Sequence, residues 1–142
     1  MKYHFIVQNE KNGYWATCVE LEGCVTQADT KKELVEHMAE ALDVYLDEPL
    51  HSQVIFPLPL LQGNNASWVS VPVSPQIAFA FLLRRERVLH QLTQRDVASL
   101  LSMRNLYSYQ RLERSRSANP TLQTIAMILK VFPTFPVEHV WR

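Results

Sequence analysis

The chain has 142 residues, with 14 basic and 14 acidic side chains and a formal net charge of zero. Hydrophobic residues make up 47% of it and charged residues 20%, which excludes an intrinsically disordered chain. No apolar run reaches the roughly 18 to 20 residues that a membrane helix needs, so we expect no membrane protein. A net charge of zero by itself argues against a nucleic-acid binder, which usually carries a basic surplus.

The charge is divided unevenly along the chain. Residues 1–75 contain ten acidic and four basic residues, a net charge of −6, whereas residues 76–142 contain four acidic and ten basic residues, a net charge of +6. The sign changes at Pro72 to Pro75, where the hydrophobic period changes too. Such asymmetry predicts a division of labour between a first domain at 1–75 and a second domain at 76–142.

The first half predicts strands and one helix. Turns at Gly13 and Gly23 separate segments rich in aromatic and β-branched residues, which is typical of strands. Thr30 and Glu33 match a capping box, and the apolar residues that follow keep a helical spacing up to Pro49. The predicted order is β-β-β-α-β, an α+β pattern. The strands are expected at residues 3–7, 14–20, 24–28 and 68–73, with irregular chain at 50–67.

The second half predicts only helices. Residues 77–91 form one apolar-rich helix. Thr93 with Asp96 caps a second helix, and Asn105 caps a third after a short turn at 102–104. A fourth helix restarts after residues 119–121. Its expected buried face consists of Leu122, Ile125, Ala126 and Leu129, with Ile128 as a further candidate.

Two short helices joined by a tight turn are what reading a DNA major groove requires. That groove is about 12 Å wide and admits one helix. Amide, hydroxyl and guanidinium groups read the base edges, while basic side chains around them hold phosphates. The expected phosphate contacts are Gln94, Arg95, Arg104 and Arg114, and the expected base readers are Tyr107, Ser108, Gln110 and Arg111. The cap Asn105 completes the expected set of DNA-binding residues.

Two resemblances follow from these motifs. Residues 92–101, 109–113 and 119–122 resemble the Cro/repressor (Xre-type) helix-turn-helix. The first half is similar to HicB-type antitoxins, whose motifs occur here in the same order. They are Gly13-Tyr14-Trp15, Gly23-Cys24, Gln27-Ala28-Asp29-Thr30 and Glu40-Ala41-Leu42.

The resemblance implies a function for each half. HicB proteins have a partial RNase H-like fold, neutralise a small mRNA-cleaving HicA toxin and repress their own operon. We therefore expect a cytoplasmic antitoxin without a cofactor that binds a HicA-type toxin and operator DNA as a homodimer or higher even oligomer. An acidic helix face complements a basic toxin. The expected toxin-binding residues are Glu33, Glu36, Glu40, Asp43 and Asp47.

Several alternatives stay open. The main rival is a one-component repressor whose first domain binds a small ligand. A second is a metal-dependent nuclease, although residues 3–7 hold none of the carboxylates that such chemistry needs on the first strand. Cys18 and Cys24 together with His4 fit no zinc spacing, and the two cysteines are expected to be packed or idle thiols. The acidic run and the group Arg84, Arg85 and Arg87 could each be a solvated helix surface, and the apolar tail 131–141 could pack on its own domain or form a dimer contact.

Overall fold

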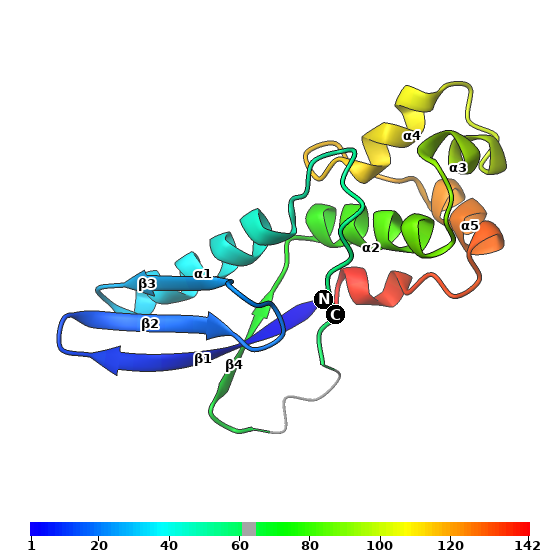
Figure 1. Ribbon diagram of the computed structural model, residues 1–142. Coiled ribbons are helices and arrows are strands. Elements are labelled where there is room, and N and C mark those ends of the chain that lie inside the picture. Colours follow the sequence, from blue (N-terminus) through cyan, green and yellow to red (C-terminus); the bar gives the residue numbers. More distant parts are fainter. Residues whose placement is uncertain (61–64) are drawn as a thin grey trace. The chain divides into compact units, whose positions relative to one another are not determined.

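Two compact units make up the computed structural model, which describes residues 1–60 and 65–142 (Figure 1). Unit 1 comprises Met1–Leu46, Phe56–Ser74 and Arg142, and unit 2 comprises Asp47–Ile55 and Pro75–Trp141. Of the segment expected to be irregular, residues 61–64 lie outside the described part. No helix in that part is long and apolar enough to cross a membrane.

Unit 1 contains a four-stranded antiparallel sheet and one helix, in the predicted order. The strand order is β3-β2-β1-β4, with Ile6 opposite Thr17 on β2 and Tyr3 opposite Val71 on β4. The β1–β2 turn depends on Gly13, which has a φ of 140° and whose Cβ would lie 2.6 Å from the carbonyl oxygen of Ala28. The elements are β1 (Lys2–Glu10), β2 (Gly13–Cys18), β3 (Val25–Ala28), α1 (Lys31–Leu46) and β4 (Trp68–Pro72).

The core of unit 1 lies between one face of the sheet and α1. Side chains of β1 point alternately to the two faces of the sheet. Tyr3 and Phe5 are fully buried on one face, whereas on the other His4 is buried and Ile6 is 43% exposed. The helix contributes a row of buried side chains at four-residue spacing, which confirms the predicted apolar face at its first three positions. That row is Leu34, Met38, Leu42 and Leu46. Tyr45 and Ala41, also expected on this face, are half-buried, and Leu46 was not predicted.

Unit 2 is helical and is built around α2, which begins with Pro75 at its first position. Six successive residues of α2, from Ala78 to Leu83, are buried, so the helix is surrounded on most sides. The elements are α2 (Pro75–Leu89), α3 (Gln94–Leu100), α4 (Leu106–Glu113), α5 (Leu122–Val131) and the 3-10 helix η1 (Val137–Val140). The caps predicted at Thr93 and Asn105 are both confirmed by hydrogen bonds to the Asp96 and Ser108 backbone N–H groups.

The helices α2 and α3 end in the same way. After α3, the N–H of Ser102 donates to Ser99 O at 3.0 Å and that of Met103 donates to Ala98 O at 2.9 Å, which is the Schellman arrangement. Gln91 and Leu92 repeat it after α2. The left-handed position of each motif usually holds glycine, yet Gln91 and Ser102 have φ of 56° and 53°. Each of these side chains therefore strains its turn.

We expect Ser102→Gly to raise the free energy of unfolding by about 0.5 to 1 kcal/mol, because glycine removes the left-handed penalty and loses part of that gain to backbone entropy. Ser99→Gly, inside α3, is the control and should lower it by about 0.5 kcal/mol. Urea unfolding followed by circular dichroism measures both changes. A less stable Ser102→Gly protein would contradict this account of the turn.

The predicted buried face of α5 is wrong at Leu122 and Ala126 and confirmed at Ile128. Ile128 is fully buried, whereas Leu122 is 86% exposed, Ala126 is exposed, and Ile125 and Leu129 are half-buried. The helix is apolar on two sides, and the unit packs the side that carries Ile128. The C-terminal tail packs within its own unit, since Phe132, Phe135 and Val140 are buried there.

The segment Asp47–Ile55 belongs to unit 2, although it precedes β4 in the chain. Its Leu50 carbonyl accepts a hydrogen bond from Gln94 at 2.8 Å, and its Asp47 carboxylate accepts one from the Ser115 hydroxyl at 2.6 Å. The boundary expected between residues 75 and 76 falls between Ser74 and Pro75. The expected first domain at 1–75 therefore includes ten residues that the structure assigns to the other unit, the nine of this segment and Pro75.

Candidate functional site: a candidate nucleic-acid interface on unit 2

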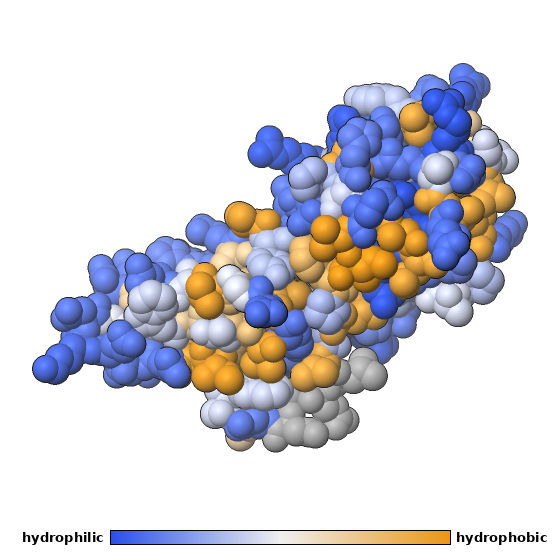
Figure 2. All heavy atoms as spheres, in the orientation of Figure 1, coloured by the Kyte–Doolittle hydropathy of each residue, from blue (hydrophilic) through white to orange (hydrophobic). Residues whose placement is uncertain are grey.

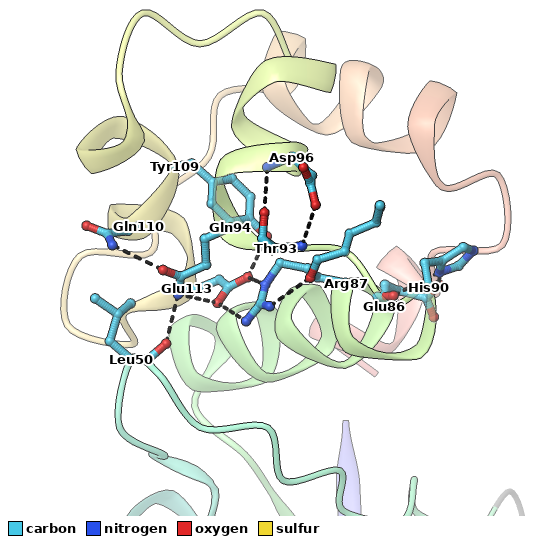
Figure 3. A network of polar contacts seen from close by, with 11 residues as sticks. Leu50, Glu86, Arg87, His90, Thr93, Gln94, Asp96, Tyr109, Gln110 and Glu113 are labelled. Carbon is cyan, nitrogen blue, oxygen red and sulfur yellow. Dashed lines mark hydrogen bonds and ion pairs between the residues drawn. The ribbon is translucent and has the colours of Figure 1, made fainter.

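A buried ion pair joins α4 to α2 (Figure 3). The guanidinium of Arg87 donates to both carboxylate oxygens of Glu113, from Nε at 2.5 Å and from Nη2 at 3.0 Å. The Tyr109 hydroxyl donates to the same carboxylate at 2.5 Å. Burial alone would lower the pKa of Arg87, but the Glu113 carboxylate holds it above its usual range. Burial, reinforced by that negative charge, raises the pKa of Tyr109.

The basic group on α2 does not form a solvated surface. Arg84 and Arg87 are only 3% and 2% exposed, so the expectation of a solvated helix end or a phosphate contact is wrong for both. Burial lowers the pKa of Arg84, against the attraction of the Glu48 carboxylate. Of the three arginines, only Arg85 is partly exposed, and its Nη1 lies 3.7 Å from Glu86 Oε1. The sequence could not distinguish these arginines, because burial depends on what packs against α2.

Two glutamines of the predicted site are bonded to each other. Gln110 Nε2 donates to Gln94 Oε1 at 3.1 Å, and Gln94 Nε2 donates to Leu50 O and, at 3.2 Å, to Glu113 (Figure 3). Both side chains are half-buried. These amides therefore hold α3 against α4 within unit 2. The predicted contacts of Gln94 to a phosphate and of Gln110 to a base would have to replace these hydrogen bonds.

A hollow of about 300 Å³ gathers three of the predicted base readers, Tyr107, Ser108 and Arg111. Tyr107 is 58% exposed and Arg111 is exposed. Ser108 is partly engaged, because its N–H and its hydroxyl both bond to the Oδ1 of Asn105. Sequence reasoning missed four polar residues that complete the hollow, although the threonine that caps α5 signalled this segment. They are Ser117, Asn119, Thr121 and Thr124.

A second hollow, of about 580 Å³, holds Gln94 and Arg95. None of the described residues that line this hollow is acidic. His51 and Gln53 contribute to it from the segment 47–55, and no pattern in the sequence indicated that contribution. Arg104 and Arg114 are exposed but line neither hollow.

The predicted toxin-binding row is shorter than expected. Glu33, Glu36 and Glu40 are exposed on α1. Asp43 instead accepts hydrogen bonds from the N–H and the hydroxyl of Ser74, which tie the end of β4 to the helix. Asp47 lies beyond the end of α1 and belongs to unit 2. Three carboxylates therefore remain as one row.

His4 and Glu20 form a buried polar pair in unit 1. His4 Nδ1 lies 2.6 Å from Glu20 Oε1, and the carboxylate also accepts the N–H groups of His4 and Leu60. Burial alone would raise the pKa of Glu20, but these hydrogen bonds hold it below its usual range. Cys18 and Cys24 are free and buried. The part of the chain that the structure describes contains no group of three or more His, Cys, Asp or Glu that could hold a metal ion.

Comparison with known proteins identifies relatives. No family model matches the chain. A UPF0150 protein of Archaeoglobus fulgidus is 38% identical over 48 residues, which are 33% of this chain and 70% of that protein. One of Helicobacter pylori is 31% identical over 80 residues, 56% of this chain and 100% of that protein. The chain belongs to the UPF0150 family. A third UPF0150 protein, of Thermoplasma acidophilum, is 40% identical over 48 residues, 33% of this chain and 70% of its own length.

The matches cover only part of this UPF0150 chain. The match spans 56% of this chain but the full length of the Helicobacter pylori protein. The remaining 44% of this chain has no counterpart in that relative. The family name carries no function, but the UPF0150 family includes HicB-like antitoxin proteins.

Proposed function

We propose that this UPF0150 chain is an antitoxin that occludes a HicA-type mRNA-cleaving toxin and represses its own operon. The observation that carries the proposal is membership in a family that includes HicB-like antitoxins. The order β1, β2, β3, α1, β4 supports a partial RNase H-like unit 1. The role proposed for that unit is binding without catalysis.

The exposed charge of α1 supports the toxin-binding role. Glu33, Glu36 and Glu40 are exposed along α1, beyond the two exposed lysines with which the helix begins. An RNA-cleaving partner needs a basic surface for its own substrate, and complementary charge steers the two proteins together. Covering the toxin's RNA-binding surface would inhibit it without any chemical step.

The helices α3 and α4 support the DNA-binding role. In this proposal α4 enters the major groove, where Tyr107 and Arg111 reach base edges while Arg95, Arg104 and Arg114 hold phosphates. Gln94 and Gln110 position the two helices through their mutual hydrogen bond. The exposed apolar side chains of α5, with Leu122 at 86%, support a homodimer that reads two half-sites.

Co-expression with a neighbouring gene tests the proposal. The full chain is produced, with a tag, together with the short basic reading frame encoded beside it. We expect the two proteins to purify together and the complex to leave mRNA uncleaved, whereas the isolated partner cleaves it. A full chain that neither captures this partner nor protects mRNA would refute the antitoxin role and favour a one-component repressor.

A further inference from the structure

Unit 1 contains a cavity of about 500 Å³ that the proposed function does not yet use. It lies where the β1–β2 turn, the end of β3 and the first turns of α1 meet, at the end of unit 1 that is covered with hydrophilic side chains in Figure 2. Its lining combines three carboxylates with aromatic rings. The residues that matter are Glu10, Asp29, Glu33, Tyr14, Trp15 and His37.

The carboxylates of the cavity are not held in ion pairs, and the lysine beside the cavity, Lys31, has its Nζ over the Tyr14 ring. Within residues 1–60 and 65–142, no ion pair joins Glu10, Asp29 or Glu33 to a basic side chain. Glu10 ends β1, Asp29 follows β3 and Glu33 lies on α1, so the charge comes from three segments and does not follow one helix face. A cavity walled by three carboxylates attracts a cation strongly and repels an anion.

The aromatic rings of the cavity also suit a cation. His37 Nδ1 donates to the carbonyl oxygen of Gln27 at 2.8 Å, which fixes the ring at the cavity wall. The ring of Tyr14 already attracts one cation, since Lys31 Nζ lies 5.9 Å from its centroid. Trp15 is 40% exposed and presents a second ring. Such rings bind flat cations on their faces.

The walls of the cavity are held in place before anything binds. Gly13 lets the β1–β2 turn approach the end of β3, where a Cβ would meet the Ala28 carbonyl oxygen at 2.6 Å. On the helix side, the N–H of Glu33 bonds to the Thr30 hydroxyl at 3.2 Å. A site that is already ordered loses less conformational entropy on binding a ligand than a flexible site does.

We propose that this cavity receives an arginine side chain of a basic protein partner. Guanidinium presents five N–H donors in a planar fork that matches carboxylates and stacks on aromatic rings, whereas an ammonium group does neither as well. The identity of the partner as the toxin rests on the proposed function. The preference for arginine rests on the cavity alone, and it turns the general attraction of an acidic surface into recognition of one side chain.

The indole signals of the full chain test this inference without the toxin. The ¹⁵N-labelled protein has three indole N–H resonances, from Trp15, Trp68 and Trp141, which single Trp→Phe variants assign. Hexa-arginine is titrated, with hexalysine as the probe of equal charge. We expect the Trp15 resonance to shift saturably, with hexa-arginine bound about two- to fivefold more tightly, while the Trp141 resonance stays fixed. Equal affinity for both peptides, or no shift of Trp15, would overturn the inference.

Matched charge variants complete the test. Glu33→Gln removes one carboxylate from the cavity, and Glu22→Gln removes one from an exposed turn of the same unit. We expect the first variant to weaken hexa-arginine binding about fivefold and the second less than twofold. Equal weakening would refute the cavity as the site. If these results hold but the neighbouring gene product is not captured, the proposed function fails and the arginine site stands.

Discussion

Replacing Glu113 by glutamine is expected to lower the free energy of unfolding of the protein by about 3 to 5 kcal/mol. The side chains of Glu113 and Arg87 are 0% and 2% exposed, so water cannot compensate the guanidinium when the carboxylate is removed. Glutamine keeps the size of the side chain but offers one acceptor oxygen to Arg87 and Tyr109 in place of two. The variant therefore retains the shape of the core and loses the charge.

Thermal unfolding followed by circular dichroism measures this effect. Glu138→Gln is the matched control, because the Glu138 side chain is 53% exposed and lies 3.8 Å from His139, so its loss should change stability by less than about 0.5 kcal/mol. Fluorescence of Tyr and Trp side chains under urea provides a second measure. A loss below 1 kcal/mol for Glu113→Gln would mean that the buried pair does not hold α4 on α2.

Arg111→Ala is expected to weaken binding to the promoter of the protein's own operon by about 1 to 3 kcal/mol, or roughly 5- to 150-fold. The guanidinium is exposed beside Tyr107 and Ser108, on the helix that the proposal places in the major groove. The Arg111 carbonyl accepts the Ser117 hydroxyl, a backbone contact that alanine retains. The loss should therefore come from the interface and leave stability unchanged.

Titration of a labelled promoter fragment at several salt concentrations measures this effect. Arg116→Ala is the control, since Arg116 is also exposed but lines neither hollow. Arg95→Ala should weaken binding to all sequences alike and reduce the salt slope by about one, as expected for a phosphate contact. Equal effects of Arg111→Ala and Arg116→Ala would remove Arg111 from the proposed base-reading site.

Local features of the fold could be predicted from the sequence. At the caps, the side chains of Thr93 and Asn105 accept hydrogen bonds from backbone N–H groups three residues ahead. At the turn, Gly13 adopts a positive φ because it has no side chain. Most of the buried row of α1 was predicted for a similar reason, because one side of that helix is apolar and the other charged. In each case the deciding contacts lie within a few residues of one another in the chain.

The candidate sites were predicted less well, because they combine distant segments. The residues Tyr107, Ser108 and Arg111 were expected from the third predicted helix, but the polar residues around the start of α5 that share their hollow were missed. The cavity of unit 1 joins Glu10 to Glu33, which come from elements that nothing in the local pattern connects. The place of a side chain on its own helix or strand does not reveal what lies opposite.

The order of the elements, the caps and the opposed charges of the two halves follow from the sequence alone, because they depend on local bonding and on composition. Three other features were decided only by tertiary packing. The arginines Arg84 and Arg87 became buried, α5 packed through Ile128, and the segment 47–55 joined unit 2. In each case the local pattern allows several surfaces to be buried, and the free energy of packing distant elements together selects one of them.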